Sequence, residues 1–155
     1  MTDGEFIADV EKYRDMLFRL AYSNTGDLSC CDDIVQEVFI RYLNAGKRFA
    51  DEQSKKFWLI RVTINRCRDH TRLFRNTHRC GFDENTAYEN DSGLDEKLAL
   101  REALKKLPAK YRDVIFLHYY EGYSAAQIGK ILKISTSAVT SRLQRARETL
   151  RKYLE

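Results

Sequence analysis

The chain has 155 residues, with 27 basic and 23 acidic side chains and a formal net charge of +4. Only 7 glycines and 1 proline accompany 32% charged residues, which favours a helix-rich chain over a β-sandwich or a Gly/Pro-rich disordered one. No apolar run approaches the roughly 18 residues of a membrane span, and the acidic N-terminal segment lacks the order of a signal peptide. The 4 cysteines are too few for a disulfide scaffold of this size. We therefore expect a cytoplasmic protein without membrane insertion.

The charges fall in alternating blocks along the chain. Residues 1–40 carry 3 basic and 9 acidic side chains, and residues 41–80 carry 11 and 3. Residues 81–96 carry 6 acidic side chains and no basic ones, and residues 97–155 carry 13 basic and 5 acidic ones. Two basic surfaces that attract phosphate backbones, separated by acidic ones, are one interpretation, and ordinary solvated helix faces are the other.

The first half of the chain has the apolar periodicity of three helices. The spacing predicts helices near 5–23 and 30–45 and a third from about 57 to 75, with Ser29 as the N-cap of the second and Gly46 just past its end. A short polar loop is expected up to about residue 55. The predicted apolar stripes are, in chain order, Phe6, Val10, Tyr13, Leu17 and Leu20; Ile34, Val38 and Tyr42 beside Val35, Phe39 and Leu43; and Phe57, Ile60, Ile64, Cys67, Thr71 and Phe74.

Periodicity stops between residues 76 and 94, where the sequence is polar, acidic and rich in turn formers. We therefore predict an all-α fold of two small helical domains, residues 1–75 and 95–155, joined by a flexible acidic linker at 76–94. Domains this small are near the lower limit for a self-sufficient core, so either could depend on a partner.

The end of the chain predicts a helix-turn-helix, with helices near 124–132 and 136–152 around a tight turn. Ser124 is the expected first N-cap, and Ser135 or Thr136 the second. Beside the apolar stripe of the second helix lie side chains suited to base edges and phosphates: Ser137, Thr140, Ser141, Arg142, Gln144, Arg145, Arg147 and Arg151. The alternative is a basic surface helix in an α-hairpin.

Two further faces carry charge. The third helix has a basic edge of Arg61, Asn65, Arg68, Arg72 and Arg75, with Trp58 one turn ahead of it. Such an edge can bind backbone phosphates and stack on bases, or it can be a solvated face with Trp58 half-buried. The second helix opens with Asp32, Asp33, Gln36 and Glu37, which either complement the helix dipole or dock a basic protein.

Catalytic and metal signals are weak. There is no phosphate-binding glycine loop and no HExxH motif. Cys67, His70, His78 and Cys80 could bind zinc, but Cys67 falls on the core stripe and the spacing matches no zinc motif. His118 is interpreted as a packed histidine and not as a base. We predict no enzyme activity, no metal, no cofactor and no small-molecule substrate.

Residues 31–39 (CDDIVQEVF) and residues 57–72 (FWLIRVTINRCRDHTR) resemble the region-two helix, and the promoter-melting helix after it, of bacterial RNA polymerase sigma factors of the extracytoplasmic-function type. Residues 107–115 (LPAKYRDVI) and 123–132 (YSAAQIGKIL) resemble region four, and residues 139–147 (VTSRLQRAR) resemble its recognition helix. These segments occur in the family's order, on both sides of the predicted linker.

The resemblance implies an initiation subunit that binds core RNA polymerase and promoter DNA. Its core-binding residues would be Asp32, Asp33, Gln36 and Glu37, which would contact the clamp helices of the largest polymerase subunit. Its downstream-element residues would be Trp58, Arg61, Asn65, Arg66, Asp69 and Arg72, with an unstacked base captured by a loop at residues 53–56. Ser137, Thr140, Ser141, Gln144 and Arg145 would read the upstream element, and Arg142 and Arg147 would hold phosphates. The linker would thread toward the RNA exit path, and an anti-sigma factor is an expected partner.

Three positions depart from the family pattern. Lys133 replaces the usual glycine and Gly129 stands where alanine is common, which predicts a looser turn, and Thr140 stands where many relatives have a basic residue. The competing interpretation is a stand-alone helix-turn-helix regulator whose N-terminal half is a dimerisation or sensor module.

Overall fold

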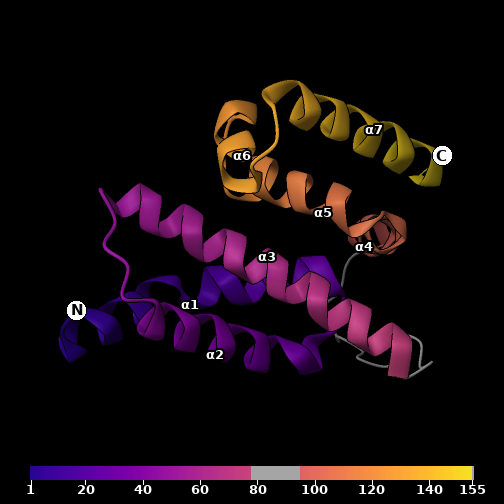
Figure 1. Cartoon of the computed structure of the whole chain (residues 1–155). Coiled ribbons are helices and arrows are strands. Elements are labelled where there is room, and N and C mark those ends of the chain that lie inside the picture. The colour runs from indigo at the N-terminus through magenta and orange to yellow at the C-terminus, as the bar shows by residue number, and fades with distance from the viewer. Residues whose placement is uncertain (78–94, 155) are drawn as a thin grey trace. The chain divides into compact units, whose positions relative to one another are not determined.

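The computed structural model describes residues 1–77 and 95–154, and all the regular structure in these ranges is helical (Figure 1). The predicted all-α class is therefore confirmed. The elements are α1 (Asp3–Thr25), α2 (Leu28–Ala45), α3 (Glu52–Thr77), α4 (Asp95–Lys106), α5 (Ala109–Ile115), the π-helical turn η1 (Phe116–Tyr120), α6 (Ala125–Leu132) and α7 (Thr136–Leu154). They form two compact units, Met1–Cys80 and Gly81–Glu155. Apart from its first two residues, the predicted linker lies outside the described ranges.

Local side-chain caps define the ends of α1 and α2. Thr2 and Glu5 form a capping box at the start of α1, and left-handed Gly26 ends that helix. The N-cap of α2 is Asp27, whose carboxylate accepts a hydrogen bond from the Ser29 N–H at 3.0 Å. The prediction of Ser29 as the cap is wrong because Ser29 already lies inside the helix. Gly46, with φ of 59°, ends α2 as predicted.

Helix α3 is longer than predicted at both ends. It begins at Glu52 because the Asp51 carboxylate accepts a hydrogen bond from the Ser54 N–H at 2.8 Å, which satisfies a donor of the first turn. Residues 53–56 therefore lie in this helix, and the prediction of a loop there is wrong. The other end runs to Thr77, two residues past the predicted domain limit.

The three helices of the first unit pack against one another around one apolar core. Its buried members include Leu17, Leu20, Val38, Leu59, Ile60 and Ile64. All but Leu59, which the spacing did not predict, come from the three predicted stripes, so each helix contributes mainly the face that its periodicity indicates. Leu43 is the exception: it is 49% exposed and belongs to the outer face of α2.

A polar network ties the same three helices together. Asp9 of α1 is 7% exposed, and its carboxylate accepts a hydrogen bond from the Tyr42 hydroxyl of α2. The Lys55 ammonium of α3 lies 3.1 Å from the same carboxylate and 3.5 Å from Glu52. A buried carboxylate needs such partners because burial without them is costly.

The second unit is organised around α7, which packs against α4, α5 and α6. Its core includes Leu107, Val114, Leu117, Ile128 and Val139. The predicted helix-turn-helix is confirmed in α6 and α7. Ser124 and Gln127 form a capping box for α6, and the Ser135 hydroxyl accepts a hydrogen bond from the Ala138 N–H at the start of α7.

The turn between α6 and α7 is tight. Lys133 has a left-handed backbone, with φ of 59° and ψ of 45°, and the Ile134 N–H donates to the Gly129 carbonyl at 3.0 Å. A Cβ on Gly129 would lie 2.8 Å from the Ile134 carbonyl oxygen, so only glycine allows this close approach. Glycine at 129 admits the turn backbone, while Lys133 takes the strained conformation that usually falls to glycine.

Substituting Lys133→Gly is expected to stabilise the second unit by about 0.5–1 kcal/mol. A left-handed backbone costs a residue with a Cβ about 1–2 kcal/mol, and glycine removes this strain. The greater flexibility of glycine in the unfolded chain offsets only part of that gain. Amide hydrogen exchange in α6 and α7 measures the effect. The matched control is Lys130→Gly, inside the same helix, which should lower protection by about 1 kcal/mol. Equal losses in both variants would show that Lys133 is unstrained.

Candidate functional site

Helix α2 presents an acidic face to solvent. Its opposite face is buried in the core, which leaves the four predicted docking residues exposed: Asp32, Asp33, Gln36 and Glu37. Ile40 continues the line from Asp33 and Gln36 and is 57% exposed. An exposed isoleucine next to the acidic side chains adds an apolar group at one end of this face, which sequence periodicity alone did not identify. No described helix combines the length and the apolar character that a membrane crossing demands.

One residue of this face is paired within the chain. The Arg66 guanidinium of α3 donates a hydrogen bond to the Glu37 carboxylate, and it also lies 3.9 Å from Asp69. The hydrogen bond and charge of Arg66 lower the pKa of Glu37, and the same hydrogen bond raises the pKa of Arg66. Glu37, a predicted polymerase-contacting residue, is thus paired with Arg66, a predicted DNA-contacting residue.

The other predicted residues of α3 lie along one edge of the helix. Asn65, Arg68, Asp69 and Arg72 are exposed, and Arg61 is partly exposed. These side chains, at steps of three and four, form a basic edge with amide and carboxylate groups among the guanidinium groups. The side chain of Arg75, which the same pattern includes, lies outside the described residues.

Trp58 is half-buried in an aromatic cluster, as the more conservative interpretation of the sequence had it. Its ring centroid lies 5.7 Å from that of Phe49 and 6.1 Å from that of Tyr42, and the Lys47 ammonium lies 5.9 Å from it. Phe49 comes from the loop before α3 and was not predicted. A hollow of about 660 Å³ next to this cluster is lined by Asp9, Lys47, Arg48, Phe49 and Lys55, among others.

Helix α7 buries Val139, Leu143 and Ala146 and presents its polar side chains to solvent. Of the predicted DNA-contacting residues, Arg142 is partly exposed and the rest are exposed: Ser137, Thr140, Ser141, Gln144, Arg145 and Arg147. The small hydroxyl side chains lie in the first two turns and the arginines further on. This order lets the start of the helix approach base edges while guanidinium groups reach the backbone.

Arg147 is held in place by a neighbouring tyrosine. Its Nε donates to the Tyr119 hydroxyl at 2.8 Å, and its guanidinium carbon lies 5.9 Å from the centroid of that ring. Tyr119 belongs to η1, where His118 Nδ1 hydrogen-bonds the Tyr123 carbonyl oxygen at 2.8 Å; His118 is half-buried and is not a core residue. A fixed guanidinium loses less conformational freedom when it binds an anion.

Sequence reasoning missed the residues whose roles depend on distant partners. Asp9 falls within the apolar stripe of α1, between Phe6 and Tyr13, and an acid in that position is a signal of a buried polar contact. Ile40 could have been found as an apolar residue on the polar side of its helix. Tyr119 carried no signal, because its contact with Arg147 spans 28 residues.

The geometry defines a helical protein with an acidic, partly apolar face on one helix, a basic edge on the next and a helix-turn-helix with an exposed polar and basic second helix. The sequence matches the family Sigma-70 region 2 over residues 10–76 and the family Sigma-70, region 4 over residues 97–150. The chain belongs to the sigma-70 family, among the RNA polymerase sigma factors of the extracytoplasmic-function (ECF) type. Its function is that of a sigma factor in transcription initiation.

Several relatives extend this result over nearly the whole chain. The ECF RNA polymerase sigma factor SigW of Bacillus subtilis is 33% identical across 98% of this chain and 90% of its own. SigL of Mycobacterium tuberculosis, another ECF sigma factor, is 32% identical across 94% of this chain and 86% of its own. Among solved structures, the sigma factor RpoE of Bartonella quintana, in complex with the anti-sigma factor NepR, has a similar fold, with a TM-score of 0.76, 20% identity and coverage of 97% and 96%. CnrH, in complex with the cytosolic domain of CnrY, gives a TM-score of 0.72 at 25% identity, with coverage of 99% and 89%.

Proposed function

We propose that α2 docks the chain on core RNA polymerase through Asp32, Asp33, Gln36 and Glu37, with Ile40 as the apolar part of the contact. Three observations support this assignment. The face is exposed, it lies in the region-2 match, and it pairs acidic groups with an apolar residue. Interfaces of this composition combine steering by charge with burial of an apolar anchor.

We further propose that α3 and α7 contact the two promoter elements. The basic edge of α3, with Arg61, Asn65, Asp69 and Arg72, would meet the downstream element, and Arg66 would join it when released from Glu37. Trp58, half-buried beside Phe49, would offer only its exposed part to a melted strand. On α7, Ser137, Thr140, Ser141, Gln144 and Arg145 would read the upstream element while Arg142 and Arg147 hold phosphates.

In this proposal residues 1–75 and 95–155 work as two DNA-contacting domains and residues 76–94 as their tether. The chain acts in the cytoplasm as a regulatory subunit and not as a catalyst. An anti-sigma factor is a proposed partner, because the sigma factor RpoE, which has a similar fold, is bound to the anti-sigma factor NepR in its solved structure.

The observation that carries the proposal is the co-occurrence of the region-2 and region-4 matches with exposed polar faces on the helices that they cover. Reconstituted transcription with core polymerase on matched genomic fragments tests it. We expect promoter-specific transcripts that depend on this protein. Tight binding to palindromic DNA without polymerase, and no transcripts, would instead support the stand-alone regulator.

Substituting Arg145→Ala is expected to weaken upstream-element recognition by about 1–3 kcal/mol, the usual loss for a specific base contact. The measurement is the ratio of transcripts from a promoter with its upstream element intact and one with that element scrambled. Arg151→Ala, nearly two turns further along α7, is the matched control and should leave this ratio unchanged. Equal transcript ratios in the two variants would show that Arg145 does not contribute to recognition of the upstream element.

A further inference from the structure

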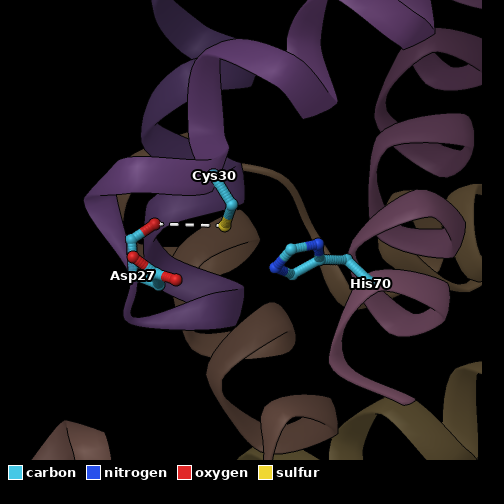
Figure 2. A group of neighbouring side chains, drawn as sticks. All are labelled: Asp27, Cys30 and His70. Carbon is cyan, nitrogen blue, oxygen red and sulfur yellow. Dashed lines mark hydrogen bonds between the residues drawn. The ribbon is translucent and has the colours of Figure 1, made fainter. Parts of the chain in front are cut away.

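Three side chains with different metal-ligand chemistry meet where α2 begins. Asp27 is the N-cap of α2, Cys30 lies in its first turn, and His70 lies on α3. One ligand atom from each lies within 4.8 Å of the other two. Figure 2 shows the His70 ring turned toward the Cys30 sulfur and Asp27. We propose that Asp27, Cys30 and His70 form a zinc site.

The donor set fits zinc better than other common divalent ions. Zinc accepts thiolate sulfur, imidazole nitrogen and carboxylate oxygen, whereas magnesium and calcium select oxygen alone. Ligand atoms around a tetrahedral zinc ion lie roughly 3.5 Å apart, so separations of up to 4.8 Å need to contract by at most about 1.3 Å to complete the site. Three protein ligands leave a fourth position for water.

The hydrogen bonds of Asp27 and Cys30 are compatible with metal binding. Asp27 uses Oδ1 to accept both the Ser29 N–H at 3.0 Å and the Ser29 hydroxyl at 2.6 Å, so Oδ2 can bind the metal while the cap is kept. The Cys30 thiol donates to the Asp27 carbonyl at 3.2 Å, a weak bond that a metal–thiolate bond would replace. Cys30 is 7% exposed and the other two are half-buried, which limits competition from water.

This site differs from the zinc interpretation that the sequence alone suggested. That interpretation grouped His70 with Cys67, His78 and Cys80, of which the last two lie outside the described residues. Cys67 is fully buried on the core face of α3. In the proposed site, His70 pairs instead with residues about 40 positions earlier, so a bound ion would join α2 to α3.

The test uses the full chain, freed of metal by chelation. Cobalt serves as a spectroscopic probe of thiolate ligation and tetrahedral geometry, and competition with a chromophoric chelator gives the zinc affinity. We expect one zinc per chain. Cys30→Ser and His70→Gln should each lower the zinc affinity by more than roughly 10- to 100-fold. That range is the usual loss when a residue that only hydrogen-bonds a metal ligand is removed. Zinc should also raise the unfolding temperature of the parent chain and not that of Cys30→Ser.

A double variant, His78→Gln with Cys80→Ser, is the matched control and should bind zinc as the parent chain does. Loss of binding in this control would overturn the proposal in favour of the other cysteine–histidine group. Absence of a cobalt–thiolate band in the parent chain, or unchanged affinity in Cys30→Ser, would overturn it as well. If circular dichroism shows that Cys30→Ser does not fold, two other results test the proposal: the cobalt spectrum of the parent chain and the zinc affinity of His70→Gln, a substitution at a half-buried position.

Discussion

Substituting Asp9→Ala is expected to destabilise the first helical unit by about 3 kcal/mol, as when one partner of a buried ion pair is removed. The loss leaves the Tyr42 hydroxyl and the Lys55 ammonium without their shared carboxylate, at the point where three helices meet. Trp58, the only tryptophan, lies in this unit, so urea unfolding followed by its fluorescence reports the change directly.

The control for this substitution is Asp15→Ala, which removes an exposed acid from the same helix and should change stability by less than about 0.5 kcal/mol. A double variant with Lys55→Met measures the coupling between the two charges. Equal unfolding midpoints for Asp9→Ala and Asp15→Ala would mean that the network does not stabilise the unit.

The same network gives the first unit a defined alkaline limit. Burial and the bond to Asp9 raise the pKa of Tyr42 to about 12 from its ordinary 10.0. Burial lowers the pKa of Lys55, but the hydrogen bonds and charge of Asp9 outweigh it and raise that pKa above 10.5. Raised folded-state values contribute stability below pH 10, which is lost as the pH rises through them. The decline above pH 10 should be shallower in Asp9→Ala.

Substituting Ile40→Asp is expected to weaken binding to core RNA polymerase by about 2 kcal/mol, or roughly 30-fold, because buried apolar anchors dominate interface energies. The side chain is 57% exposed on α2, so the fold should tolerate the change. Fluorescence anisotropy of labelled protein titrated with core polymerase, in the absence of DNA, measures the affinity.

Ile7→Asp provides a closely matched control. Ile7 is 56% exposed on α1 and is not one of the proposed docking residues, and its substitution should leave the affinity unchanged. Glu37→Ala should weaken binding to a smaller extent, since an exposed charged pair contributes about 0.2–1 kcal/mol. Parent affinity in both Ile40→Asp and Glu37→Ala would place the docking surface elsewhere on the chain.

The sequence predicted elements better than the contacts between them. Apolar spacing located the three helices of the first unit and the two helices of the helix-turn-helix, because burial of one face is a local pattern that tertiary packing then uses. The start of α3 was placed too late, since residues 52–56 are polar and their helical state depends on the Asp51 cap. Ser29 was chosen over Asp27 although both can cap, and only the backbone conformation distinguishes them.

The sequence predicted the site residues as groups of exposed polar side chains. Helical periodicity can indicate that a side chain is exposed, but it cannot indicate its partner on another helix. The buried Asp9 contact spans 46 residues and the group of Asp27, Cys30 and His70 spans about 40, so neither has a local signature. The pairing of Glu37 with Arg66 was also out of reach, because each residue fitted its own helix face and nothing in the spacing relates the two helices.

That pairing has a thermodynamic consequence. A ligand that draws the Glu37 carboxylate away releases the Arg66 guanidinium, and an anion that captures Arg66 releases Glu37. Linkage requires the two effects to be equal, so polymerase and DNA would each raise the affinity for the other by the same factor. An exposed ion pair limits this cooperativity to about 1 kcal/mol, or roughly fivefold. Each ligand would therefore bind up to about fivefold more tightly when the other is already bound, and each would still bind alone.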